Sequence, residues 1–119
     1  MIVAIDHVQL AMPPGGEPRA RAFYAGVLGL VEVAKPAHLA ARGGCWFENE
    51  TVRVHLGVEQ AFVPARKAHP AFQVRDLAAL LARCREYGID VSDEEQGERD
   101  HHAYVADPFG NRIELIEPL

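Results

Sequence analysis

The feature that most restricts the fold of this 119-residue chain is a repeated spacing between glycines and potential metal ligands. Gly29 lies 26 residues before His55. Gly88 lies 26 residues before Glu114, so the same spacing occurs in both halves of the chain. Each half also places a histidine ahead of a segment with helical periodicity, His7 in the first half and His69 in the second. The chain is therefore predicted to contain two similar halves that use these four residues together.

Hydrophobic periodicity predicts one strand, one helix and three strands in the first half. Alternation places Val8 and Leu10 on one face of the first strand and His7 and Gln9 on the other. Pro18 suits the first turn of a helix, and Gly29 suits its end. The predicted elements are a strand at 3–11, a helix from Pro18 to Gly29, and strands at about 30–34, 44–48 and 51–58.

The second half repeats this order after a linker at roughly 59–68. Asp76 is a good helix N-cap, and the sequence from Asp107 to Asn111 has strong turn chemistry, with Gly110 predicted at positive φ. The predicted elements are a strand at 69–74, a helix between Asp76 and Gly88, and strands at about 89–92, 102–106 and 112–116.

These elements predict an α+β fold of two βαβββ modules, about 1–58 and 69–119, in a single domain over 1–119. Val54 and Leu56 alternate with His55, and Ile113 and Leu115 alternate with Glu114. The apolar residues are predicted to face the helices. The four ligand-type residues then share the concave face of a curved mixed sheet, where a small-molecule site is expected.

Composition narrows the classes of partner. The formal net charge is −5 and the basic residues are scattered, which argues against nucleic-acid and anionic-membrane partners. No apolar run approaches the roughly 20 residues of a membrane span, and the N-terminus lacks the features of a signal peptide. The two cysteines, Cys45 and Cys84, are isolated, and Cys84 falls on the apolar stripe of the second helix. A cytoplasmic protein is the expectation.

Three imidazoles and one carboxylate form a plausible ligand set for a divalent transition metal: His7, His55, His69 and Glu114. A lone strand histidine is usually a surface or hydrogen-bonded residue, but four such residues at matching positions favour a metal site. An alternative leaves His55 outside the ligand set, as a supporting or substrate-contacting residue. The remaining three would then form a two-histidine, one-carboxylate triad like those of non-haem iron sites.

Other polar residues share the predicted ligand face. Gln9, Arg53 and Gln73 either orient a substrate or hydrogen-bond across the sheet. Tyr104 is a candidate acid or hydrogen-bond donor near the metal, although strand tyrosines more often pack. Residues 99–102 form a polar cluster that is predicted to be a solvated loop or a mobile lid.

Four motifs together resemble the vicinal oxygen chelate superfamily: DHVQLAM, RAFYAGVLGL, VHLGVE and YVADPFGNRIELIEP. This superfamily includes glyoxalase I, extradiol dioxygenases, fosfomycin-resistance proteins, methylmalonyl-CoA epimerase and bleomycin-binding proteins. The resemblance covers essentially the whole chain and is closest to small bacterial glyoxalase-like proteins. Superfamily members place a ligand on the first and last strands of each module, which implies the same four residues here.

The resemblance also implies an activity. It suggests one divalent ion per site (zinc, nickel, cobalt, manganese or iron), with Glu114 and Tyr104 in catalytic positions. Bacterial glyoxalase I typically has glutamate where this chain has His55, which argues against its usual chemistry. The extradiol dioxygenase signature matches from Tyr104 to Glu114, but its preceding histidine is missing at 96–98. Lyase, isomerase or epimerase chemistry on a small oxygen-chelating substrate is therefore favoured over dioxygenation.

Two further expectations follow from the resemblance. The alternative to an enzyme is a non-catalytic protein that binds and sequesters a small molecule or antibiotic. The protein is expected to be a homodimer with shared sites, each taking His7 and His55 from one chain and His69 and Glu114 from the other.

Overall fold

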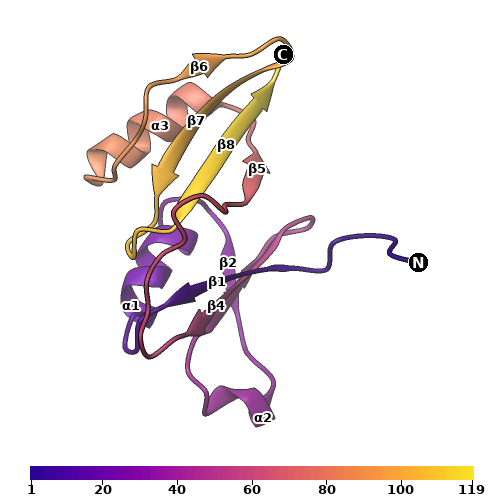
Figure 1. Cartoon of the computed structure of the whole chain (residues 1–119), viewed down its shortest axis with the longest axis vertical. Helices are drawn as coiled ribbons and strands as arrows, with labels where there is room; N and C mark the ends of the chain where they lie inside the picture. The colour runs from indigo at the N-terminus through magenta and orange to yellow at the C-terminus, as the bar shows by residue number, and fades with distance from the viewer. The chain divides into compact units, whose positions relative to one another are not determined.

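The computed structural model describes all 119 residues as two compact units, Met1–Val63 and Pro64–Leu119. The division falls within the predicted linker. Each unit contains one four-stranded mixed sheet with helical segments beside it (Figure 1). The predicted α+β class and the two-module plan are therefore confirmed. That the two units form a single domain stays a prediction.

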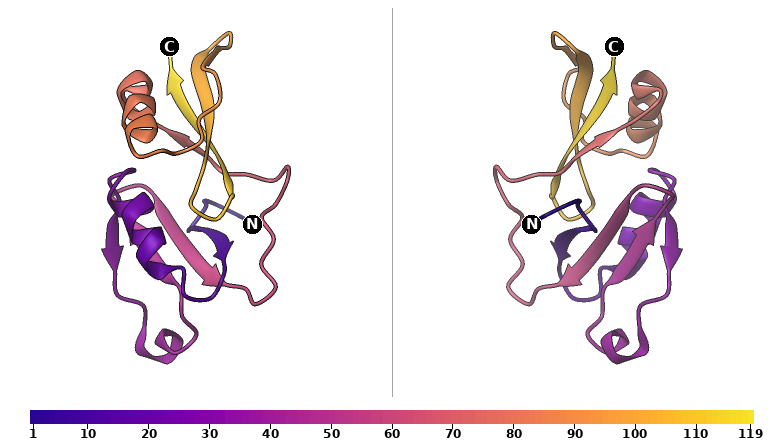
Figure 2. Two further views of the ribbon diagram at one scale, coloured as in Figure 1. Left: turned by 90° about the vertical axis from the view of Figure 1, so that its left-hand side faces the viewer. Right: turned by 90° about the vertical axis from the view of Figure 1, so that its right-hand side faces the viewer.

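The first unit has the strand order β1-β4-β3-β2, with β1 parallel to β4 and the other pairs antiparallel. Its helical segment lies beside the sheet (Figure 2). The Tyr24 ring of this segment stacks on that of Phe47 in β3, with centroids 5.6 Å apart. The elements are β1 (Val8–Met12), α1 (Glu17–Ala20), η1 (Arg21–Ala25), β2 (Val31–Val33), α2 (Ala37–Ala40), β3 (Cys45–Glu48) and β4 (Arg53–Val58).

The second unit has the order β5-β8-β7-β6, with β5 parallel to β8. Helix α3 packs on β7 and β8 through its predicted apolar stripe, in which Leu77, Leu81 and Cys84 are buried. The Asp76 side chain accepts a hydrogen bond from the backbone N–H of Ala79 at 3.0 Å, which confirms the predicted N-cap. The elements are β5 (Ala71–Gln73), α3 (Leu77–Glu86), β6 (Glu95–Gln96), β7 (Asp100–Ala106) and β8 (Arg112–Pro118).

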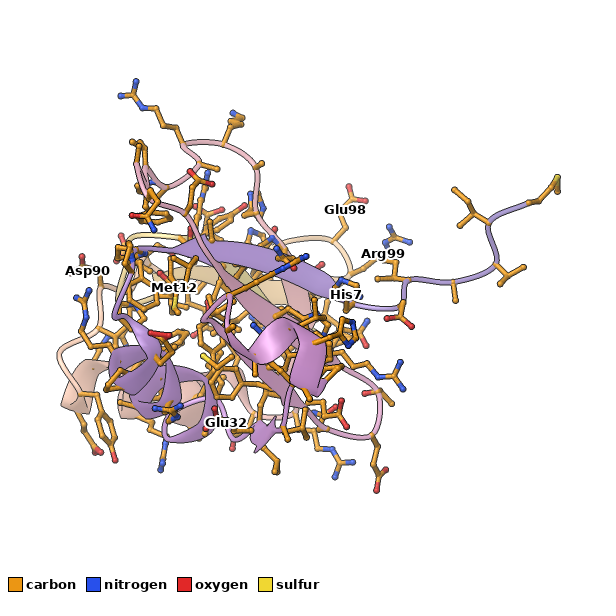
Figure 3. The ribbon with its side chains drawn as sticks, turned by 90° about the horizontal axis from the view of Figure 1, so that it is seen from below. His7, Met12, Glu32, Asp90, Glu98 and Arg99 are labelled. Carbon is orange, nitrogen blue, oxygen red and sulfur yellow. The ribbon has the colours of Figure 1, made fainter.

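Two predicted elements form with other bounds or geometry, and one short helix was not predicted. The first strand begins at Val8, and the residues before His7 run outward in extended form (Figure 3). The predicted helix from Pro18 to Gly29 contains a π-helical turn, in which the N–H of Leu28 donates to the carbonyl of Phe23. Residues 37–40, for which the sequence predicted no element, form the short helix α2.

The predicted strand at 89–92 is wrong. Only Val91 makes a bridge there, to Val105. Ser92 still donates its backbone N–H to the carbonyl of Tyr104 at 2.8 Å. Its hydroxyl, rather than a backbone carbonyl, accepts from the backbone N–H of Tyr104 at 2.8 Å, and the ladder does not continue as a strand. The fourth strand of the sheet forms later, as β6. None of the helices has the length and hydrophobicity needed to span a bilayer.

Candidate metal centre

In the first unit, His7 and His55 come together. Gln9 of β1 lies beside His55 of β4 in the parallel ladder, and His7 precedes Gln9 by two residues. The two imidazole rings stack with centroids 4.1 Å apart and planes 19° apart. The sequence predicted His7 within the first strand, but in the structure it lies just before β1. These two residues are called the first pair below.

In the second unit, His69 and Glu114 come together with the same offset. Ala71 of β5 lies beside Glu114 of β8, and His69 precedes Ala71 by two residues. The Nε2 atom of His69 lies 3.0 Å from Oε1 of Glu114. These two residues are called the second pair, and they lie at the same position in the second sheet as the first pair does in the first sheet. Each unit thus brings together two of the four predicted ligands, and within either unit no group of three metal-binding side chains forms.

Both strand-preceding histidines are anchored through Nδ1. The Nδ1 of His69 lies 2.8 Å from the carbonyl oxygen of Lys67, and that of His7 lies 2.9 Å from the Asp6 carboxylate. Both partners are acceptors, so Nδ1 carries the proton in each ring and donates it. Histidines that bind metals typically donate the other ring N–H in this way. The arrangement leaves the Nε2 atoms of His7 and His69 as the ligating positions.

The contact between His69 and Glu114 fits a cation. With Nδ1 protonated, Nε2 of His69 and the carboxylate of Glu114 are both acceptors, and they lie 3.0 Å apart. Two acceptors at this distance need a proton or a metal ion between them. Neighbouring ligands at about 2.1 Å from one ion and at a right angle would be about 3 Å apart. The second pair therefore has donor chemistry and spacing that suit a divalent metal.

The ring of His55 is held by stacking. It lies parallel to the Trp46 indole, with centroids 3.9 Å apart and planes 2° apart, and its other side faces His7. Burial, with a smaller contribution from His7, lowers the pKa of His55 below its ordinary value. A lowered pKa keeps the imidazole neutral near pH 7, which is the form that binds metals. Trp46 was not among the predicted site residues, although it lies directly opposite His55 in the β3–β4 ladder.

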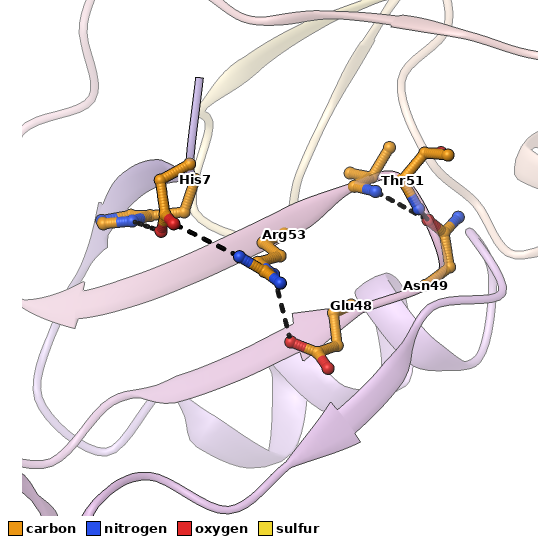
Figure 4. A network of polar contacts seen from close by, with 7 residues as sticks. His7, Glu48, Asn49, Thr51 and Arg53 are labelled. Carbon is orange, nitrogen blue, oxygen red and sulfur yellow. Dashed lines mark hydrogen bonds and ion pairs between the residues drawn. The ribbon is translucent and has the colours of Figure 1, made fainter. Parts of the chain in front are cut away.

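Asp6 and Arg53 support the first pair, and Figure 4 shows Arg53 near His7 and Glu48. The Arg53 guanidinium lies 3.2 Å from the Asp6 carboxylate and 3.8 Å from that of Glu48. Asp6 in turn orients His7, whose hydrogen bond is the main cause of the lowered Asp6 pKa. Arg53 therefore already has two carboxylate partners, and its predicted contact with substrate stays a prediction. Sequence reasoning missed Asp6, although its position next to a candidate ligand was a usable signal.

The predicted substrate-binding glutamines have different surroundings. Gln9 lies over Gly57, where an added Cβ would come within 2.6 Å of the Gln9 amide nitrogen. Glycine at this position therefore leaves room for the Gln9 side chain beside His55. Gln73 is exposed at the end of β5, opposite Ile116. A role for either residue in substrate binding stays a prediction.

Tyr104 lies next to the second pair. It is directly opposite Glu114 in the β7–β8 ladder, and its ring meets that of His69 edge-on at 5.3 Å. The same face of β7 carries His102, which the sequence placed both at the start of the predicted strand 102–106 and in the polar cluster expected as a loop or lid; the strand is the observed state. The Asp100 carboxylate accepts a hydrogen bond from Nδ1 of His102 at 2.9 Å, and this bond is the main cause of the raised pKa of His102. The alternation of His102 with Tyr104 could have revealed this position.

Comparison with known proteins identifies the family. The sequence profile of the Glyoxalase/Bleomycin resistance protein/Dioxygenase superfamily matches residues 4–115. The chain belongs to this superfamily. No curated protein matches the chain.

Solved structures agree with this assignment. A glyoxalase family protein from Bacillus anthracis is 46% identical, with a TM-score of 0.93, and the alignment covers 100% of this chain and 98% of that one. The fosfomycin resistance protein FosX from Listeria monocytogenes is 15% identical, with a TM-score of 0.81 and coverage of 100% and 96%. TnmS3, an antibiotic-binding protein from Streptomyces sp. CB03234, is 23% identical, with a TM-score of 0.74 and coverage of 99% and 100%. The last two share the fold.

Proposed function

We propose that this protein is a divalent-metal-dependent enzyme that acts on a small substrate with two neighbouring oxygen donors. The proposed ligands are His7, His55, His69 and Glu114. The observation that supports this most strongly is the equal offset of the two pairs, since Gln9 lies beside His55 as Ala71 lies beside Glu114. An ion held by four protein ligands in octahedral coordination has two open positions, which suits a hydroxyketone, an enediol or a catechol.

The bound ion would act as a Lewis acid that stabilises negative charge on a substrate oxygen. The protein residues then have distinct tasks. Asp6 and the Lys67 carbonyl fix the histidine tautomers, and Trp46 holds the His55 ring. Glu114 supplies the one anionic ligand, and Tyr104 places a phenol next to the second pair. These groups favour proton-transfer chemistry of the lyase or isomerase type, with extradiol dioxygenation as the second candidate.

We further propose that the protein is a homodimer whose sites are shared between chains. Each unit holds only one pair, so a complete site needs a first pair and a second pair. The dimer would combine the first pair of one chain with the second pair of the other.

A binding protein without turnover is the competing function. The likeness in fold to TnmS3 favours it, as does a recess of about 580 Å³ in the second unit, which has the size of a small-molecule site. Such a protein would retain its ligand when the metal is removed, whereas the proposed enzyme would lose turnover.

The test is metal content. Untagged protein should carry close to one divalent ion per chain, measured by elemental analysis. His69→Ala and Glu114→Ala should each lose most of the ion, because one missing ligand removes much of the affinity of a small ligand set. His38→Ala is the matched control, since His38 is exposed on α2 and should leave metal content unchanged. Full occupancy in the His69→Ala/Glu114→Ala double variant would refute the assignment.

A further inference from the structure

The recess of about 580 Å³ in the second unit has no part in the proposed metal site. Tyr104 and Arg112 line it, together with residues 64–66 and 90–92 and the turn at Gly110. Tyr104 also contacts His69 and lies opposite Glu114. The recess therefore begins beside the second pair and extends toward the β7–β8 turn.

The charge in this recess is mainly positive and has no partner within the protein. Arg66, Arg112 and Asp90 line it, and none of the three forms an ion pair or a side-chain hydrogen bond in the structure. Arginines elsewhere on the surface do pair, as Arg21 does with Glu32 at 2.7 Å. Two guanidinium groups therefore face one carboxylate, which leaves an excess of positive charge.

Arg112 is held in place without losing its charge. Its guanidinium carbon lies 3.8 Å from the centroid of the Tyr104 ring, a cation–π contact that restrains the group. The side chain is partly buried, so a ligand group bound there would be shielded from water on one side. A fixed guanidinium with free N–H donors suits a carboxylate or a phosphonate, which it can bind through two hydrogen bonds.

We infer that this recess binds an anionic group, a carboxylate or phosphonate, of the substrate, and that Arg112 is its main contact. The inference rests on the proposed function, because it places the rest of the substrate at the metal. Arg112 and Glu114 lie two residues apart on one face of β8, which corresponds to about 7 Å along a strand. The substrate class is thus a small acid that carries its charged group apart from its chelating oxygens.

The test uses metal-free protein, so that it does not depend on the metal site. Methylphosphonate and acetate are titrated at constant ionic strength, with methylammonium as the cation control, and binding is followed by NMR of the arginine Nε–Hε signals. Saturable binding of the anions is expected. Arg112→Gln should weaken it roughly tenfold or more, since a charge-assisted hydrogen-bond pair is lost, and Arg112→Lys should weaken it less.

Arg75→Gln is the matched control, because Arg75 is an exposed arginine of the same unit that does not line the recess. Its anion binding should equal that of the wild type. The absence of saturable binding, unchanged binding in Arg112→Gln, or equal losses in Arg112→Gln and Arg75→Gln would overturn the inference. Metal content is measured separately. If the protein binds metal but no anion, only the anion-binding role of the recess is refuted. If it binds anions through Arg112 but no metal, only the four-ligand metal site is refuted.

Discussion

Mixing two inactive variants tests the shared site directly. His7→Ala removes a ligand from the first unit, and Glu114→Ala removes one from the second. Each variant alone should bind little metal, because every site carries one lesion. In a dimer that contains one chain of each kind, shared sites would place both lesions in one site and none in the other. One site combines both damaged pairs, and the other combines the intact second pair of the first variant with the intact first pair of the second.

The expected magnitude follows from counting sites. Random exchange between equal amounts of the two variants makes about half of the dimers mixed. Each mixed dimer regains one site for its two chains, so the whole sample should recover about 0.25 ions per chain, compared with about one in the wild type. Purified mixed dimers, isolated with two different tags, should contain about 0.5 ions per chain. Sites built within one chain would recover none.

The assay is elemental analysis after subunit exchange and removal of loose metal by dialysis. His7→Ala mixed with His55→Ala is the matched control, because both lesions lie in the first pair and no exchange can restore it. Recovery in this control, or none in the mixture of His7→Ala with Glu114→Ala, would refute the shared-site reasoning. A monomeric protein that binds metal fully would refute it as well.

Three further predictions concern stability, titration and activity. Leu56→Ala should lower the free energy of unfolding by about 2–5 kcal/mol in urea denaturation, whereas the exposed Val31→Ala should change it by less than about 0.5 kcal/mol. Asp100→Asn should lower the pKa of His102 in an NMR titration, because the hydrogen bond to Asp100 raises that pKa from 6.5 in the folded protein. The stabilisation by Asp100 should therefore be complete below pH 6.5 and lost as the pH rises through the raised pKa. Equal pH dependence of unfolding in the variant and the wild type would contradict this. His55→Glu creates the ligand set that resembles bacterial glyoxalase I, so it should retain metal and gain weak activity on the methylglyoxal–glutathione hemithioacetal; an efficient wild-type glyoxalase would contradict the argument from His55.

The sequence predicted the faces of the central strands because strand alternation does not depend on distant contacts. Val54 and Leu56 are buried on one face of β4, and Ile113 and Leu115 are buried on one face of β8, as predicted. Local backbone signals were equally informative. Gly29, Gly88 and Gly110 have φ values of 78°, 71° and 91°, and the first two end helical segments where periodicity ends.

Features that depend on tertiary contacts were not predictable in the same way. The stack of Trp46 on His55 depends on the register between β3 and β4. The anchoring of His69 by the Lys67 carbonyl depends on how the linker enters β5, and no residue type encodes a backbone acceptor. Ser92 illustrates the converse case, since its hydroxyl takes the place of a backbone acceptor for the Tyr104 N–H, and the predicted strand is reduced to one bridge.

The equal offset of the two pairs is the point at which sequence and structure support each other most. Spacing along the chain could place His55 and Glu114 at equivalent positions, but it could not fix the register of parallel strands that are joined by a whole module. The structure supplies that register, and the same two-residue offset occurs in both sheets. The pairs differ in charge, however, because stacked imidazoles form the first and a histidine with a carboxylate forms the second. Under the proposed function, the second unit would therefore provide the only anionic ligand, together with the arginine-lined recess beside it. This unit would then set both the net charge of the metal site and the class of acid that binds there.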